Sequence, residues 1–67
     1  MGTVKIVLGI TRQDRGLTQE QLARLVGLHV KTIEKWEQQK VRRLDKKIIG
    51  DFCRVLECNI DGVVIYE

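Results

Sequence analysis

The chain has 67 residues, a length that suits one domain and leaves little room for both a core and an enclosed active-site cavity. Hydrophobic residues make up 43% of it and charged residues 31%, a balance that excludes a disordered chain and indicates a globular one. The formal net charge is +3, and seven of the 12 Lys and Arg residues lie between positions 31 and 47. That run favours either a phosphate-facing surface or an ordinary solvated helix face.

Two short β-like runs stand near the ends of the chain, at residues 4–8 (VKIVL) and 63–66 (VVIY). Lone strands are weak, so the two runs are expected to form a small antiparallel ribbon, within one chain or between two. A first helix is expected over residues 7–15. Gly9 weakens it by about 1 kcal/mol relative to alanine, and Gly16 suits its C-terminal end.

The clearest helix is expected over residues 18–26. Thr18 is a good N-cap, and Gln21 completes a capping box with it. Gly27 tolerates the left-handed conformation that ends a helix. The predicted buried stripe of this helix consists of Leu22, Ala23, Leu25 and Val26.

A third helix is expected over residues 29–38, although His29 is a poor capping residue. Ile33 and Trp36 are expected to face inward. Residues 38–44 are polar and basic and are predicted to form a loop. Asp45 can cap a fourth helix that runs to about Leu56 and whose apolar face is formed by Ile48, Ile49, Phe52, Cys53, Val55 and Leu56.

The spacing of the second and third helices predicts a helix-turn-helix over residues 18–38. Ala23 provides the small residue where the two helices cross, and Gly27 provides the turn. Ile33 and Trp36 anchor the second helix of the pair to the core. Its other side is then free to enter a DNA major groove, which is about 12 Å wide.

The segments that carry this pattern are residues 17–23 (LTQEQLA), Gly27 and residues 32–37 (TIEKWE). Together they resemble the Cro/C1-type (XRE family) helix-turn-helix DNA-binding domains of bacterial and phage repressors. Residues 52–58 (FCRVLEC) and 63–67 are similar to the short prophage-type branch of this family. The resemblance covers nearly the whole chain, from about residue 6.

The resemblance implies a mainly α, five-helix, lambda-repressor-like domain over residues 1–67. From the residues themselves, Asn59 can cap a last short turn over residues 60–62 before the terminal β-like run. The resemblance implies that Gln19 contacts a phosphate and that Arg12 is a structural partner of Glu37. It also implies a repressor-like transcriptional regulator. A single module of this size offers limited contact area on DNA, so we expect the protein to work as a homodimer. Gln39 stands where the family usually has a glycine, so the loop after the third helix is expected to bend differently.

Predicted contacts to DNA follow from these positions. Lysine can bond guanine, so Lys31 is the first candidate base reader, and an apolar Val30 suits a thymine methyl group. Glu34 can accept from cytosine or pair with a nearby lysine. The predicted base contacts are Val30, Lys31, Thr32, Glu34 and Lys35, and the predicted phosphate contacts are Thr18, Gln19, His29, Lys40, Arg42 and Arg43.

We therefore expect sequence-specific binding of double-stranded DNA. The alternative is a protein-interaction module, or an antitoxin-like partner, on a helix-turn-helix scaffold that has lost DNA binding. The apolar Val30 and the missing glycine at Gln39 motivate that alternative. No nucleophile–base pair or glycine-rich phosphate loop stands out, so we expect no enzymatic activity, no cofactor and no small-molecule substrate.

Cys53 and Cys58 have a spacing that is unusual for zinc, and His29 is the single histidine, so no metal site is expected. Both cysteines are expected to pack as small apolar residues. The sequence shows neither a signal peptide nor a stretch of about 20 apolar residues. We expect a cytoplasmic protein with reduced thiols and no membrane association.

Overall fold

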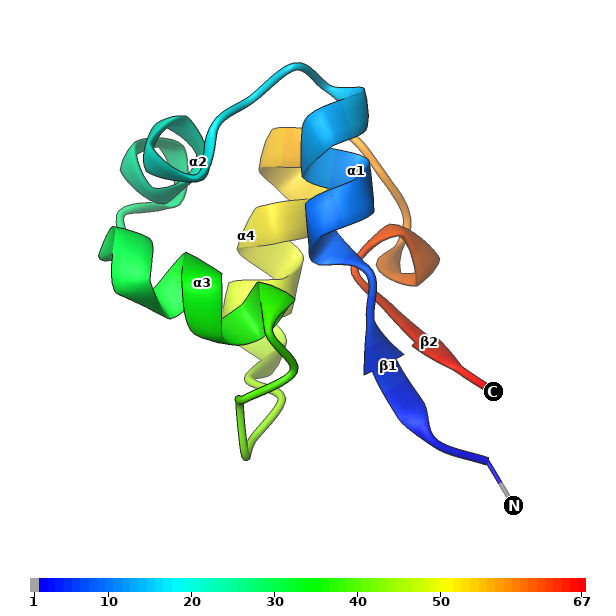
Figure 1. Ribbon diagram of the computed structural model, residues 1–67. Coiled ribbons are helices and arrows are strands. Elements are labelled where there is room, and N and C mark those ends of the chain that lie inside the picture. Colours follow the sequence, from blue (N-terminus) through cyan, green and yellow to red (C-terminus); the bar gives the residue numbers. More distant parts are fainter. Residues whose placement is uncertain (1) are drawn as a thin grey trace.

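The computed structural model describes residues 2–67, so the first residue of the expected 1–67 domain lies outside it. Four α-helices and a two-stranded ribbon make up this part of the chain (Figure 1). In chain order the elements are β1 (Val4–Ile6), α1 (Leu8–Asp14), α2 (Gln19–Val26), α3 (Val30–Glu37), α4 (Lys46–Leu56), a 3-10 turn η1 (Ile60–Gly62) and β2 (Val64–Tyr66). The mainly helical fold and the terminal ribbon are confirmed.

The start of α2 has the capping box that the sequence predicts. The Thr18 hydroxyl accepts the Gln21 backbone N–H at 3.1 Å, and the Gln21 side chain accepts the Thr18 backbone N–H at 2.8 Å. Two of the backbone donors that a helix start leaves unpaired are thereby satisfied. Gly27 ends the helix with φ of 73°, as expected. These local devices fix the length of α2 and the short turn to α3.

All four α-helices in residues 2–67 are followed by a residue in the left-handed conformation. Gly16 and Gly27 serve α1 and α2, whereas Gln39 and Glu57 serve α3 and α4 with φ of 63° and 52°. In each case the next backbone N–H bonds the carbonyl five residues back, for example Leu28 N–H to Ala23 at 2.9 Å. This bond closes the helix end, and it allows the chain to turn sharply at each of the four sites.

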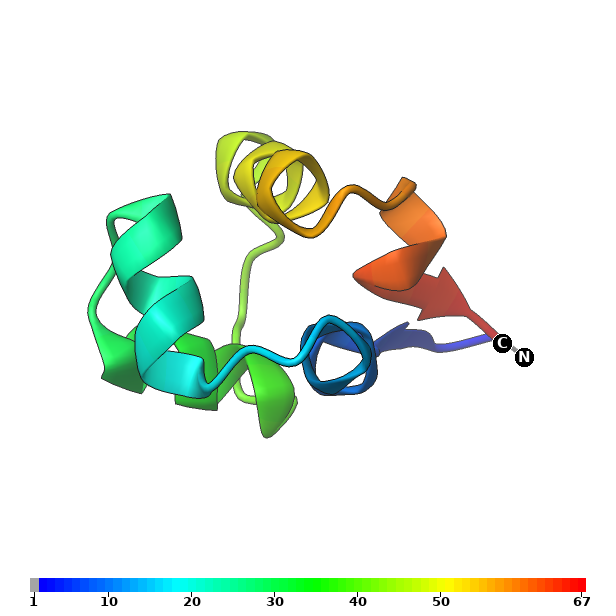
Figure 2. The same ribbon diagram turned by 90° about the horizontal axis from the view of Figure 1, so that it is seen from above.

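The core lies where the four helices and the ribbon meet, and Figure 2 shows the helices arranged around it. The Trp36 and Phe52 rings meet edge to face at its centre, with ring centroids 5.3 Å apart. The other fully buried large side chains are aliphatic: Leu8, Leu22, Ile33, Leu56 and Val63. Residues from α1, α2, α3, α4 and the segment before β2 thus share one core, which fixes the position of α3.

The ribbon is antiparallel and forms within one chain. Val4 lies opposite Tyr66, and Ile6 lies opposite Val64. The pairing extends to Val7, whose N–H bonds the Val63 carbonyl at 2.8 Å. Figure 1 shows the ribbon projecting from the helices, with both ends of the chain at its far end.

Two predictions are wrong. The expected last short turn does form, at Ile60–Gly62, but it is a three-residue 3-10 turn without a side-chain capping bond from Asn59, so the described residues contain four α-helices and not five. Leu25 does not belong to the buried stripe of α2, because it is 55% exposed. With only eight residues, α2 contacts the core over a narrow stripe centred on Leu22 and Ala23.

Candidate nucleic-acid interface

The helix expected to read DNA, α3, is anchored by one side and exposed on the other. Ile33 and Trp36 are buried, with 0% and 2% of their surface exposed. Of the five predicted base contacts, Lys31 and Lys35 are exposed, and the other three (Val30, Thr32 and Glu34) are half-buried. The structure therefore presents two lysine side chains to solvent along the free side of α3.

His29 caps α3, although the sequence suggested a poor cap. Its Nδ1 accepts the Lys31 backbone N–H at 3.1 Å. A ring nitrogen that accepts carries no proton, so this bond assigns the proton of the neutral ring to Nε2. The neutral imidazole can then donate Nε2–H to a phosphate while it caps the helix.

A network of polar side chains joins α1, α2 and the end of α3. The Arg12 guanidinium bonds both carboxylate oxygens of Glu37, at 2.7 and 3.1 Å, and also the Leu17 carbonyl at 2.7 Å. Gln19, a predicted phosphate contact, donates its Nε2 to Glu37 at 3.1 Å. The pairing of Arg12 with Glu37 is confirmed. Gln19 keeps one amide hydrogen for another acceptor, since an amide nitrogen carries two.

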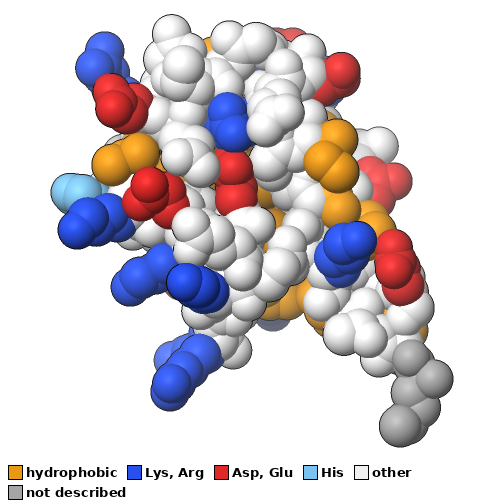
Figure 3. All heavy atoms as spheres, viewed as in Figure 1, with side chains coloured by type: hydrophobic (Ala, Val, Ile, Leu, Met, Phe, Trp, Pro, Cys, Tyr) orange, Lys and Arg blue, Asp and Glu red, His pale blue; other side chains and the backbone are white. Residues whose placement is uncertain are grey.

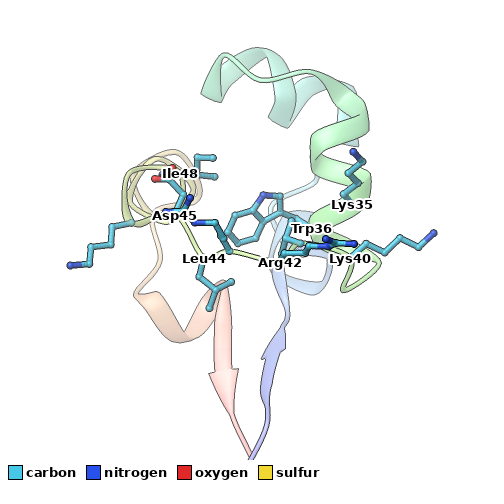
Figure 4. A pocket seen from close by; sticks show the side chains of 10 residues that line it. Lys35, Trp36, Lys40, Arg42, Leu44, Asp45 and Ile48 are labelled. Carbon is cyan, nitrogen blue, oxygen red and sulfur yellow. The ribbon is translucent and has the colours of Figure 1, made fainter.

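The predicted phosphate contacts of the basic loop (residues 38–45) line a cleft of about 840 Å³. Figure 4 shows Lys35 and Lys40 on the α3 side of this cleft and Asp45 and Ile48 on the α4 side, with Trp36 between them. Lys40, Arg42 and Arg43 are exposed. The cleft also includes Lys46, which the site prediction omitted although it belongs to the same basic run.

Lys and Arg side chains gather over α3 and the basic loop on the face shown in Figure 3. Among residues 2–67, the ion pairs within 4.0 Å involve other cations: Arg12, Arg15, Lys47 and Arg54. The cations of α3 and the basic loop (Lys31, Lys35, Lys40, Arg42 and Arg43) thus have no carboxylate partner within that part of the chain. Their charge is available to an external anion.

A second hollow, of about 380 Å³, lies between the start of α2 and the exposed side of α3. Thr18, Gln19 and Val30 line it, and so do two carboxylates, Glu20 and Glu34. The structure thus brings four predicted contacts together (Thr18, Gln19, Val30 and Glu34), but it adds Glu20, which sequence reasoning missed. A helix-start glutamate is usually assigned to the helix dipole, so no sequence signal marked it as part of the site.

The sequence model of the Cro/C1-type HTH DNA-binding domain family matches residues 8–67 of the chain. The search of curated proteins found no match. In the described part of the chain, none of the helices has the length and hydrophobicity that crossing a bilayer requires.

Proposed function

Because the chain belongs to the Cro/C1-type HTH DNA-binding domain family, we propose that it is a repressor-like regulator that binds specific double-stranded DNA sequences. In this proposal α3 enters the major groove, which is wide enough for one helix. Lys31, in the first turn of α3, reads base edges, with Val30, Thr32, Glu34 and Lys35 beside it.

The observation that carries the proposal is the set of cations without carboxylate partners on α3 and the basic loop. A protein that neutralises phosphates with Lys and Arg releases the counterions of DNA, which supplies much of the binding free energy. In the proposal Lys40, Arg42 and Arg43 contact the phosphates that flank the groove. In the proposal His29, Thr18 and the second amide hydrogen of Gln19 add hydrogen bonds to further phosphates.

We further propose that two copies bind one palindromic site. A single module buries about 600–1,000 Å² of protein surface on DNA, which limits its affinity. A twofold pair doubles that area if its two recognition helices lie about 34–36 Å apart, one helical turn of DNA. Sedimentation of the protein with and without a selected duplex tests this stoichiometry.

The direct test is selection of duplexes from a randomised library, followed by mobility-shift titration of the wild type and of Lys31→Ala. Arg54→Ala is the matched control, because Arg54 carries the same charge in the last turn of α4 and is 68% exposed. Lys31→Ala is expected to weaken binding to the selected duplex by 1–3 kcal/mol, roughly 5- to 150-fold, and to relax selection at one base pair. Selection that enriches no sequence, with binding unaffected by salt, would refute the proposal.

One observation favours a second candidate function. The hollow beside Val30 has Glu20 and Glu34 in its wall, and carboxylates there repel phosphates. A basic protein segment would suit that hollow better than DNA. If Lys31→Ala and the wild type bind every duplex equally weakly, the protein-interaction module, including an antitoxin-like role, replaces the DNA-binding proposal.

A further inference from the structure

Gln39, directly after α3 and Gln38, adopts a conformation that is unfavourable for its residue type. Its φ is 63°, in the left-handed region that favours glycine. The turn itself has the standard closing bond, from Lys40 N–H to the Lys35 carbonyl at 2.9 Å. Glycine would make the same turn without strain, so the turn alone does not explain a glutamine here.

The side chain of Gln39 binds the backbone of β1. Its Oε1 accepts the Ile6 N–H at 2.8 Å, and its Nε2 donates to the Ile6 carbonyl at 2.7 Å. These are the two bonds that a residue of an adjacent antiparallel strand would exchange with Ile6. In an antiparallel pair, alternate residues of a strand bond the neighbouring strand. Val7 N–H bonds the Val63 carbonyl, so the N–H and C=O of Ile6, one residue earlier, point away from β2. The amide therefore takes the place of a neighbouring strand at the free edge of β1.

The two bonds from Gln39 restrain the end of α3, because Ile6, which they bind, is itself held in place. Ile6 is 7% exposed and belongs to the core, and its strand pairs with β2. The start of α3 is held by its short turn to α2, and Glu37 is held by Arg12. In the described residues, the hydrogen bonds between the end of α3 and the ribbon all come from Gln39.

We propose that Gln39 is a positioning residue that holds the C-terminal end of α3 on β1 and so sets the angle at which α3 meets DNA. This inference rests on the proposed function. The two bonds to Ile6 require one acceptor and one donor on a side chain as long as that of glutamine. Asparagine is one methylene shorter, glutamate at neutral pH only accepts, and glycine keeps the turn but has no amide.

The test compares Gln39→Glu and Gln39→Gly with the wild type. The control is Gln38→Glu, which adds the same charge at an exposed neighbouring position that makes no side-chain bond to β1. Gln39→Gly covers the case in which Gln39→Glu folds poorly, because glycine suits the left-handed conformation. The probes are a duplex selected from a randomised library and a scrambled duplex of the same length and composition.

Both Gln39 variants are expected to bind the selected duplex about tenfold more weakly than the wild type, which is the effect of about one net hydrogen bond. Gln39→Gly is expected to bind the scrambled duplex within about twofold of the wild type. Gln38→Glu should weaken binding to both duplexes by the same factor. A loss of stability alone would also lower both affinities equally, so the ratio of the two affinities reports positioning. If the wild type prefers the selected duplex and Gln39→Gly keeps the wild-type ratio, the inference is overturned.

A second measurement on the protein without DNA separates this inference from the proposed function. Residual dipolar couplings give the orientation of α3 relative to α4 in the wild type and in Gln39→Gly. A changed orientation of α3 supports the inference even if the wild type prefers no duplex. The absence of any preferred duplex would refute the proposed function alone. An unchanged orientation overturns the inference.

Discussion

Replacing Arg12 by methionine removes the cation of the most buried ion pair in residues 2–67. The side chains of Arg12 and Glu37 are 10% and 13% exposed. Arg12→Met deletes two bonds to the Glu37 carboxylate and one to the Leu17 carbonyl. The remaining partner of that carboxylate is Gln19, at 3.1 Å. The variant therefore leaves a largely buried negative charge without a cation.

The expected cost is about 3 kcal/mol, the usual penalty for removing one partner of a buried pair. Domains have total stabilities of about 0.05–0.15 kcal/mol per residue, which for a chain of this length is about 3–10 kcal/mol. Arg12→Met thus removes a large fraction of the total. Replacing both residues, as in Arg12→Met with Glu37→Leu, removes both charges and should recover about 2 kcal/mol of the loss.

Urea unfolding measures these differences, because Trp36 is the single tryptophan and is buried against Phe52. Far-UV circular dichroism provides an independent signal of the helices. With a slope of about 1 kcal/mol per molar urea, the midpoint of Arg12→Met should fall by about 3 M. The single variant Glu37→Leu is measured as well. If Arg12→Met and Glu37→Leu each cost less than about 1 kcal/mol and their effects add in the double variant, the pair is not a coupled buried unit and the reasoning fails.

Three further predictions concern helix ends and the thiols. Thr18→Ala should lower stability by about 1 kcal/mol through loss of the capping box, seen as a lower urea midpoint, and an unchanged midpoint would contradict it. Gly27→Ala should lower the free energy of unfolding by about 1–2 kcal/mol through the φ of 73° alone, because an added Cβ would meet no atom within 4 Å. An unchanged urea midpoint would show that the turn relaxes and would contradict this prediction. Burial, and then the neighbouring Cys53, raise the pKa of the Cys58 thiol, so less thiolate forms at a given pH. At pH 8 iodoacetamide should alkylate Cys58 more slowly in the folded protein than in urea, as mass spectrometry can show, and an equal rate in both would contradict the prediction.

Local sequence signals predicted the elements that local forces determine. The capping box at Thr18 and the glycine at Gly27 fixed the bounds of α2 to within one residue. The short turn after Asn59 was predicted at the right residues, but the count of five helices was wrong because this stretch has room for only three residues before Val63 and β2. The exposure of Leu25 depends on how α2 packs against its neighbours, which an apolar pattern of eight residues does not specify.

The candidate site was predictable in part, for the same reason. Exposed lysines on α3 follow from helix periodicity, once Ile33 and Trp36 are assigned to the core. The bond from Gln19 to Glu37 and the clamp of Gln39 on Ile6 join segments that are 18 and 33 residues apart. No local pattern encodes such contacts, although the glutamine in place of a usual glycine marked Gln39 as unusual.

The salt dependence of DNA binding tests the central claim most directly. The dissociation constant for a selected duplex is measured between about 50 and 200 mM salt for the wild type and for the double variant Arg42→Ala with Arg43→Ala, with Arg54→Ala as control. Each lost phosphate contact should reduce the magnitude of the log–log slope by about 0.9, so the double variant should lose about 1.8 and the control nothing. Equal slopes for all three proteins would contradict the claim that the basic loop holds the DNA backbone.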